Sequence, residues 1–307
     1  MADIYDVAII GAGPAGMTAA LYCGRANLST VMFGNIFESQ LAKAGAVENY
    51  PGFDSIQGIE LVEKFNSQLG RYNIVTIPAH IGKVVPGETF TLISEGAEVQ
   101  GRCIIIATGS KHKELKINGE KEFANRGVSY CAVCDGSFYK GKPVALIGEG
   151  DHAAKSALYL AGLCKEVYVF APGQDIETTA YASQIEEFGN IHVIGNSKIT
   201  AIEGAEEVER IRYIANKQPE SLLEVKGVFI EGGAPNSRIA RDLGLEIDTK
   251  GNVVVKRPDH TTNVEGVFAA GDVTGGIHQI SKAVGEGASA AVSAAIYLKK
   301  KIKGRSR

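Results

Sequence analysis

The sequence predicts an α/β protein of two domains, with the second domain inserted into the first. Three observations support this fold class: the chain has 307 residues, one glycine-rich motif occurs twice, and apolar strands alternate with helical segments around both copies. A chain of this length exceeds most single cores and suits two domains. The 37 glycines cluster in short runs, which indicates tight turns and close approach of the backbone to ligands.

The first copy of the motif lies near the N-terminus. Tyr5–Ile10 is short and apolar, as a buried parallel strand should be, and it ends at the glycine run Gly11–Gly16. A helix is expected over Pro14–Arg25 and a second strand over Leu28–Phe33. In such a G-x-G-x-x-G turn the first glycine makes the bend, the second admits a pyrophosphate, and the third lets the helix pack on the strand. This is the pattern of a Rossmann-like, dinucleotide-binding domain.

The second copy repeats this pattern after residue 143. A strand is expected over Val144–Ile147, the G-x-G-x-x-A turn over Gly148–Ala153, a helix over Ala153–Leu163 and a further strand over Glu166–Phe170. One such motif is weak support for a nucleotide site. Two copies, each between a strand and a helix, predict two Rossmann-like domains of the FAD/NAD(P)-binding type.

The segments between the motifs set the expected domain boundaries. The strand Cys103–Ala107 is followed by the polar stretch 111–122, which indicates a crossing near residue 114, and a return is expected near residue 242. A later strand delivers an aspartate to a loop within Gly266–Asp272, and a long helix is expected over Gln279–Leu298. The expected domains are therefore 1–113, 114–242 and 243–307, the first and last forming one discontinuous dinucleotide-binding domain.

The composition excludes several classes of function. The net charge of −3 favours neither nucleic acid nor an anionic membrane as a partner. No apolar stretch approaches the length of a bilayer span, and no targeting signal is expected. Five cysteines exclude a fully paired disulfide framework, and Cys23, Cys103 and Cys164 lie in apolar runs that suit a core. A cytoplasmic location, where thiols stay reduced, is expected.

The other two cysteines, Cys131 and Cys134, are separated by two residues. This spacing at the start of a helical turn brings two sulfur atoms close enough to bond, and the helix N-terminus lowers the pKa of one thiol. The alternative is half of a zinc site, which needs a second pair of ligands. Cys103 and Cys164 have no cysteine or histidine paired with them, and the six histidines are scattered. A redox-active disulfide is therefore predicted, with no metal.

Asp135 follows the second cysteine directly. Its carboxylate is placed to carry the proton that thiol–disulfide exchange gains or loses, and a catalytic role is predicted. The simpler alternative is a helix N-cap, worth about 1 kcal/mol. The two roles are compatible.

Together these segments closely resemble the low-molecular-weight thioredoxin reductase family, over nearly the whole chain. The residues that carry the resemblance are Gly11–Gly16, Gln40-Leu41, Val47–Gly52, Ala107–Gly109, Cys131–Gly136 and Gly266–Val273. The resemblance implies FAD as the cofactor, thioredoxin or a thioredoxin-like protein as the partner, and a homodimer. It also implies that Cys131 attacks the substrate disulfide while Cys134 faces the flavin. The cofactor-binding residues that it implies are Gly11, Gly13, Pro14, Ala15, Gln40, Asn49, Thr108, Gly109, Gly271, Asp272, His278, Gln279 and Ile280.

The chain departs from the family in its second nucleotide site. Members that use NADPH carry a cluster of arginines after the second strand, whereas the segment Phe170–Glu177 has no basic residue. An acidic residue for the NADH ribose is also missing near 168–170. Glu149 lies within the phosphate turn itself, where a carboxylate about 6 Å from a phosphate costs about 3 kcal/mol unless it turns to solvent.

These departures resemble the pyridine-nucleotide-independent branch of the family, which implies reduced ferredoxin as the electron donor. Two alternatives stay open: an NAD(P)H-dependent thioredoxin reductase that binds its nucleotide through backbone contacts, and a flavin electron-transfer or redox-sensing module whose second site holds another flavin or is empty. His278 stands where many members have arginine. The basic tail 299–307 suits either a solvated helix end or a docking patch for an acidic electron donor.

Overall fold

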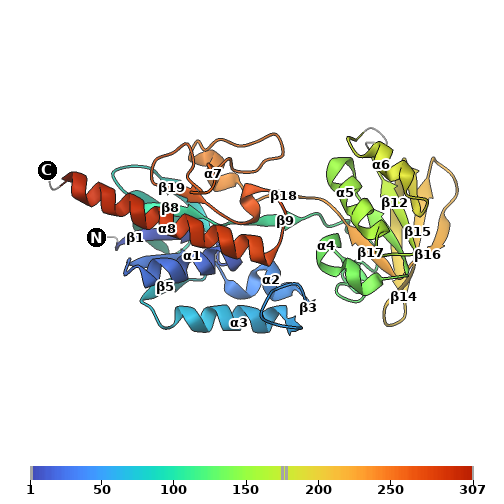
Figure 1. Cartoon of the computed structure of the whole chain (residues 1–307), viewed down its shortest axis with the longest axis horizontal. Coiled ribbons are helices and arrows are strands. Elements are labelled where there is room, and N and C mark those ends of the chain that lie inside the picture. Colours follow the sequence, from blue (N-terminus) through green and yellow to red (C-terminus); the bar gives the residue numbers. More distant parts are fainter. Residues whose placement is uncertain (1–2, 174–175, 177–178, 306–307) are drawn as a thin grey trace. The chain divides into compact units, whose positions relative to one another are not determined.

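The computed structural model describes residues 3–173, 176 and 179–305, with side chains only up to residue 301 in the last helix. The chain forms two compact units, Met1–Lys111 with Ala234–Arg307, and His112–Gly233 (Figure 1). The α/β class with a second Rossmann-like unit inserted in the first is confirmed. The connecting strands β9 (Ser110–His112) and β18 (Gly233–Pro235) pair with each other.

The return crossing comes nine residues before the expected residue 242, and the outward crossing two residues before 113. The reason lies in helix α7 (Arg238–Asp242), which packs on the first unit. Ile239 and Ala240 lie in the core of that unit. The Arg238 guanidinium donates hydrogen bonds to the carbonyl oxygens of Ile81 (3.0 Å) and Gly82 (2.9 Å). The sequence shows that α7 carries polar residues, but it does not reveal these contacts with the distant backbone of the first unit.

The first unit is built on one mixed sheet with strand order β5-β2-β1-β8-β7-β6, and β19 pairs with β8. The pairs among β5, β2, β1, β8 and β19 are parallel, and those among β8, β7 and β6 are antiparallel. A short hairpin, β3 (Ala46–Val47) and β4 (Ile56–Gln57), stands apart. The strands of the sheet are β1 (Ile4–Ile10), β2 (Thr30–Phe33), β5 (Ile74–Ile77), β6 (Ile81–Val85), β7 (Phe90–Ser94), β8 (Ala97–Ile106) and β19 (Val267–Ala269).

Alternation along these strands builds a core on both faces of the sheet. Val7 and Ile9 of β1 lie in one cluster, and Ala8 and Ile10 lie in the other. The first cluster is covered by three helices, α1 (Pro14–Arg25), α3 (Gly58–Leu69) and α8 (Ile280–Arg305). Figure 1 shows α8 beside α1, where small alanines of both helices are buried. The short helix α2 (Gln40–Lys43) packs against α3.

The second unit has a five-stranded parallel sheet in the order β10-β17-β11-β12-β13. A separate antiparallel sheet has the order β14-β15-β16. The strands are β10 (Val128–Ser129), β11 (Pro143–Ile147), β12 (Glu166–Ala171), β13 (Ile191–Gly195), β14 (Ser197–Gly204), β15 (Val208–Ala215), β16 (Ser221–Glu224) and β17 (Gly227–Ile230).

Helices cover one face of the parallel sheet and the antiparallel sheet covers the other. Val144 and Leu146 of β11 pack towards α4 (Ala132–Asp135), α5 (Gly150–Ala161) and α6 (Ala182–Glu187). Ala145 and Ile147 pack towards β14 and β15. Helix α5 begins three residues before the expected Ala153, because the chain is extended only up to Glu149. Among the described residues, no helix has both the length and the apolar character needed to cross a membrane.

Candidate functional site

The first glycine turn joins β1 to α1. Gly11 has φ +117°, and an added Cβ would collide with the carbonyl oxygen of Ala107, which follows β8. Only glycine fits this position. Gly13 is the N-cap of α1, its capping position makes no side-chain hydrogen bond, and an added Cβ would meet no atom within 4 Å. The positive end of a 12-residue helix therefore faces open space, which suits a pyrophosphate group.

Polar residues from distant segments meet beside this turn. The Gln40 side-chain amide donates to the carbonyl oxygen of Ser110, whose hydroxyl donates to Asp272 (3.5 Å). The Thr108 hydroxyl donates to the Asn236 carbonyl oxygen (2.6 Å). The three strands β1, β8 and β19 end side by side here, because they are parallel neighbours in one sheet.

The loop that carries Asp272 is held by a buried ion pair that the sequence analysis missed. The backbone N–H of Gly271 donates to Glu286 of α8 (2.9 Å), and Lys282 lies 3.0 Å from the same carboxylate. Lys282 also donates to the carbonyl oxygen of Gly271 (2.9 Å). Helix α8 thus fixes the loop that carries Asp272. The spacing Lys282–Glu286, one helical turn apart, was the available signal.

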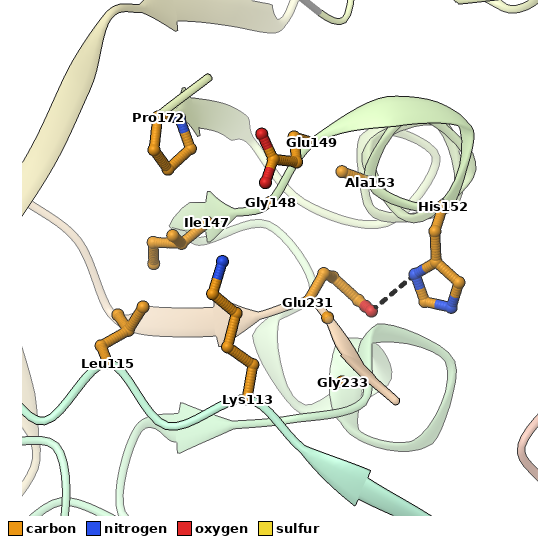
Figure 2. A pocket seen from close by; sticks show the side chains of 11 residues that line it. Lys113, Leu115, Ile147, Gly148, Glu149, His152, Ala153, Pro172, Glu231 and Gly233 are labelled. Atoms are coloured by element: carbon orange, nitrogen blue, oxygen red, sulfur yellow. Dashed lines mark ion pairs between the residues drawn. The ribbon is translucent and has the colours of Figure 1, made fainter. Parts of the chain in front are cut away.

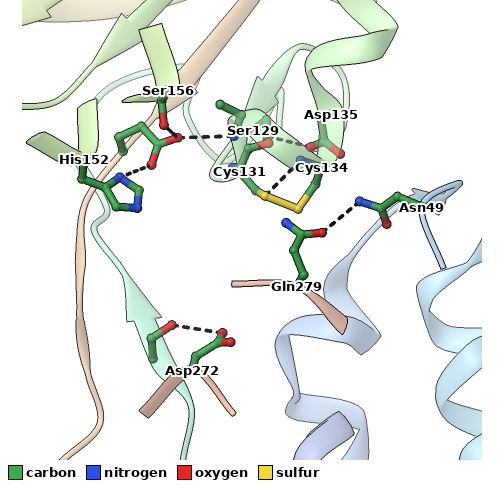
Figure 3. Close-up of a disulfide and its surroundings, with 12 residues drawn as sticks. Asn49, Ser129, Cys131, Cys134, Asp135, His152, Ser156, Asp272 and Gln279 are labelled. Atoms are coloured by element: carbon green, nitrogen blue, oxygen red, sulfur yellow. Dashed lines mark hydrogen bonds and ion pairs between the residues drawn. A yellow bond between two sulfur atoms is a disulfide. The ribbon is translucent and has the colours of Figure 1, made fainter. Parts of the chain in front are cut away.

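The remaining predicted cofactor residues surround these groups. Asn49 donates to the side-chain oxygen of Gln279 (3.1 Å), which joins the loop after β3 to the start of α8 (Figure 3). His278 is exposed and Ile280 is half-buried as the first residue of α8. Pro14 and Ala15 form the first turn of α1 after Gly13, and Gly109 lies between Thr108 and the connecting strand β9.

In the second unit, Cys131 and Cys134 form a disulfide. Cys131 is the N-cap of α4, and its sulfur accepts a hydrogen bond from the backbone N–H of Cys134 (3.1 Å) (Figure 3). A sulfur at this position points towards the positive end of the helical turn, which stabilises a thiolate when the bond is reduced. The predicted disulfide is therefore present, with its first sulfur at the start of the turn.

Asp135 lies three residues along the same turn, half-buried. Burial raises the pKa of its carboxyl group, although a hydrogen bond from Ser129 opposes this. The Ser129 hydroxyl donates to Asp135 (2.6 Å) and accepts from the backbone N–H of Cys131 (3.1 Å). The Asp135 side chain makes no capping hydrogen bond to the following turn, Gly136–Tyr139. A half-buried carboxyl with a raised pKa beside the disulfide suits proton transfer.

A cavity of about 240 Å³ lies at the second glycine turn (Figure 2). Charged residues from three segments line it: Lys113 from the connector, Glu149 from the turn, and Glu231 from the end of β17, with His152 of α5 beside them. The Glu149 carboxylate lies against the chain at Gly173, because a Cβ added there would be 2.6 Å from its oxygen. Gln174, Asp175 and Glu177, which belong to the predicted acidic segment, lie outside the described residues.

Glu231 was missed by sequence reasoning. It is only 7% exposed and has three partners: His152 Nδ1 (2.9 Å), the Ser156 hydroxyl (2.8 Å) and the backbone N–H of Ala132 (3.3 Å). Burial alone would raise its pKa, but the hydrogen bond and charge of His152 and the hydrogen bonds from Ser156 and the backbone N–H of Ala132 hold the pKa below its usual range. The only signal in the sequence is an acid directly after the apolar strand Gly227–Ile230.

Comparisons with known proteins agree with this picture. The family model for pyridine nucleotide-disulphide oxidoreductases matches residues 5–287. The chain is 38% identical to a thioredoxin reductase of Listeria monocytogenes, covering 96% of this chain and 94% of the relative. The crystal structure of thioredoxin reductase from Streptococcus pyogenes matches with a TM-score of 0.90 and 33% identity, covering 98% of this chain and 100% of that one. A ferredoxin-flavin thioredoxin reductase from Clostridium acetobutylicum matches with a TM-score of 0.53 and 32% identity, over 98% and 100%.

The chain therefore belongs to the pyridine nucleotide-disulphide oxidoreductase family, among the thioredoxin reductases. Its cofactor is FAD, in keeping with this family. The first unit fits FAD, since the open space at Gly13 could accommodate a pyrophosphate and no acidic residue stands between the glycines of the turn. Cys23, Cys103 and Cys164 are free and buried, which confirms their expected place in the core.

Proposed function

We propose that this protein reduces the disulfide of thioredoxin or a thioredoxin-like protein and takes its electrons from a reduced ferredoxin. The observation that supports ferredoxin, rather than a nicotinamide nucleotide, as the electron donor is the acidic second cavity, where a nucleotide phosphate would meet Glu149 and Glu231. The likeness to the ferredoxin-flavin thioredoxin reductase structure also supports it. A homodimer and a cytoplasmic location belong to the same proposal.

FAD, when bound, would supply the electron pair that reduces the Cys131–Cys134 disulfide, and two protons would complete the two thiols. Cys131 then attacks the partner disulfide as a thiolate, which forms a mixed disulfide and releases one partner thiolate. Cys134 attacks the Cys131 sulfur, which restores the internal disulfide and releases the second partner thiolate. Asp135, protonated more readily than an ordinary aspartate, gives a proton to a departing thiolate and regains one from a protein thiol. A one-electron donor acts twice for each disulfide reduced.

The cavity argues against NADPH through its charges. Among the described residues that line it, Lys113 is the one lysine or arginine, and two carboxylates share the space with it. NADPH-using members bind the nucleotide phosphate through arginines that this chain lacks. Each hydrogen bond between an arginine and a phosphate is worth about 1.5–3 kcal/mol, so the loss of two such bonds weakens the binding free energy by about 3–6 kcal/mol. A deficit of that size turns a micromolar site into a millimolar one.

The donor is tested by anaerobic stopped-flow mixing of the oxidised protein with NADPH, NADH or reduced ferredoxin, with the flavin band near about 450 nm as the readout. Reduced ferredoxin should bleach the band rapidly, and either nucleotide at micromolar concentration should bleach it slowly or not at all. Dithionite serves as the control for a flavin that is competent to be reduced. Rapid, complete bleaching by micromolar NADPH would overturn the proposed donor and favour an NADPH-dependent reductase.

The disulfide is tested separately by replacing each cysteine. Cys134→Ser and Cys131→Ser should both abolish reduction of thioredoxin, because the exchange needs two sulfur atoms, while FAD stays bound. Cys131→Ser leaves Cys134 as the single thiol of the pair, for which a long-wavelength absorbance shoulder is expected if it faces the flavin. Buried Cys164→Ser is the matched control and should retain activity. Near wild-type activity in either of the first two variants would show that the disulfide does not carry the electrons.

A further inference from the structure

Glu231 connects the second cavity with the redox disulfide. Strand β17 lies between β10 and β11 in the parallel sheet, so its C-terminal end delivers Glu231 between the start of α5 and the start of α4. One carboxylate oxygen accepts from the Ser156 hydroxyl and from the backbone N–H of Ala132, and the other lies 2.9 Å from His152. His152 has an exposed side chain that lines the cavity (Figure 2), whereas Ala132 is buried directly after Cys131.

The disulfide turn is therefore held from two sides by carboxylates. On one side, Asp135 accepts from Ser129, which in turn accepts from the backbone N–H of Cys131. On the other side, Glu231 accepts from the N–H of Ala132, the first residue of α4. The N–H of Cys134 points to the Cys131 sulfur. At the start of α4, the N–H of Cys134 therefore donates to a sulfur and the N–H of Ala132 donates to a carboxylate.

The negative charge of Glu231 affects the ionisation of the neighbouring Cys131 thiol. Burying an ion is unfavourable unless the ion is paired and hydrogen-bonded, and both oxygens of Glu231 have partners. A negative charge bonded to the amide beside Cys131 opposes a second negative charge on that sulfur. When His152 is protonated, its positive charge beside the other oxygen of the Glu231 carboxylate weakens the repulsion between that carboxylate and a Cys131 thiolate.

We propose that Glu231 is a positioning residue of the redox centre, whose carboxylate, paired with His152, fixes the amide after Cys131 and opposes formation of the Cys131 thiolate. The inference rests on the proposed role of Cys131 as the thiol that attacks the substrate. Other charged groups near Glu231 are Lys113 of the connector and Glu149 of the turn, which line the same cavity, and Asp135 at the end of α4. Glu231 accepts directly from an amide of the disulfide turn, whereas Asp135 reaches the amide of Cys131 through the Ser129 hydroxyl.

The test measures the acidity of the Cys131 thiol in the reduced, FAD-bound protein. Iodoacetamide is added at a series of pH values, and the rate of alkylation at Cys131 is followed by peptide mass spectrometry, because the thiolate is the reactive form. Glu231→Gln keeps the shape and an acceptor oxygen for Ala132 but removes the charge. It should lower the apparent pKa of Cys131 by about half a unit to one unit.

Two further variants separate charge from structure. His152→Asn should raise the apparent pKa of Cys131, which is opposite to the effect expected of Glu231→Gln. If Glu231→Gln fails to fold, His152→Asn is sufficient to test the inference. Glu203→Gln is the matched control, since Glu203 pairs with Arg210 and Arg212 on the separate antiparallel sheet, and it should leave the value unchanged.

The inference is overturned if Glu231→Gln behaves like Glu203→Gln, or if His152→Asn leaves the value unchanged or shifts it in the same direction as Glu231→Gln. A Cys131 that stays unreactive in the wild-type protein overturns both the inference and the exchange role of Cys131. Dithionite supplies the two electrons that open the disulfide, and the alkylation uses neither ferredoxin, nicotinamide nucleotide nor a protein substrate. An error in the proposed donor would therefore not affect these outcomes.

Discussion

The two glycine turns occupy equivalent places in their units, yet different groups surround them. In the first unit β1 leads into Gly11, and the neighbouring strand β8 ends just before Ala107. In the second unit β11 leads into Gly148, and the neighbouring strand β17 ends just before Glu231. A Cβ added at Gly11 would collide with the backbone carbonyl oxygen of Ala107, whereas one added at Gly148 would meet the Cβ atoms of Ala153 (2.9 Å) and Glu231 (3.0 Å).

The residue between the first two glycines also differs. It is buried Ala12 in the first turn and the acidic Glu149 in the second. The strand, turn and helix are common to both units, so this pattern determines the fold. The residues between the glycines and at the end of the neighbouring strand determine which ligand the turn can bind. An uncharged turn admits a pyrophosphate, and a turn with two carboxylates opposes one.

The largest expected effect separates two glycines of the first turn. Gly11→Ala should destabilise the protein by at least about 3 kcal/mol, because φ is +117° and a Cβ would collide with the Ala107 carbonyl oxygen. Gly13→Ala is the matched control for the fold, since φ is −82° and its Cβ meets nothing. It should leave the free energy of unfolding of the apo-protein within about 0.5 kcal/mol of wild type.

Gly13→Ala should nevertheless weaken FAD binding, because the new methyl group takes the space of the pyrophosphate. Since a ligand at about 1,000 times its dissociation constant stabilises the native state by about 4 kcal/mol, the variant should lose part of this stabilisation. Urea unfolding with and without FAD measures both quantities. Equal losses of apo-protein stability in the two variants would contradict the assigned roles of the two glycines.

The next effect concerns a carboxylate of the second unit that serves the disulfide. Asp135→Asn should reduce the rate of thioredoxin reduction by about 100-fold, because a proton carrier is lost while the bond from Ser129 is kept. Stability should change in the opposite sense. Burial raises the pKa of Asp135 in the folded state, so the unfolded chain loses its proton first as the pH rises.

The wild-type protein should therefore lose stability as the pH rises from the ordinary aspartate pKa through the raised pKa of Asp135. The asparagine side chain of the variant has no proton to lose, so the variant should lack this decline and be the more stable protein at neutral pH. Unfolding curves at several pH values, with the rate of thioredoxin reduction beside them, measure both. A variant that is slower and also less stable at neutral pH would indicate a structural role instead.

The smallest effect would make the second turn more like the first. Glu149→Gly should raise affinity for NADPH about tenfold, less than the full cost of about 3 kcal/mol, because the Glu149 carboxylate lies towards Gly173. Basic residues at 171–173 added to this variant should recover weak flavin reduction by NADPH. Asp151→Asn, a change of charge one residue beyond Gly150, is the matched control. Flavin bleaching at millimolar NADPH is the measurement. An unchanged rate in the combined variant would mean that charge at this turn does not limit nucleotide binding.

The parts of the fold that follow from local pattern were predicted well. Helix α1 begins at Pro14 and ends at Arg25 as expected, because a glycine turn precedes it and small residues run through it. The position of α7 was not predicted, since its contacts with Ile81 and Gly82 join segments more than 150 residues apart. The disulfide pair was local and was predicted. The bonds of Glu231 depend on three segments that meet only when the sheet forms.

The three buried cysteines have a consequence for an enzyme that exchanges sulfur bonds. Burial raises the pKa of Cys23 to about 12 and that of Cys164 to about 11, and it holds that of Cys103 well above its usual range. Thiol exchange and oxidation by peroxides both proceed through the anion. These thiols therefore stay protonated and unreactive in oxidising surroundings. Their burial, rather than their distance along the chain, suppresses wrong disulfides with Cys131 or Cys134.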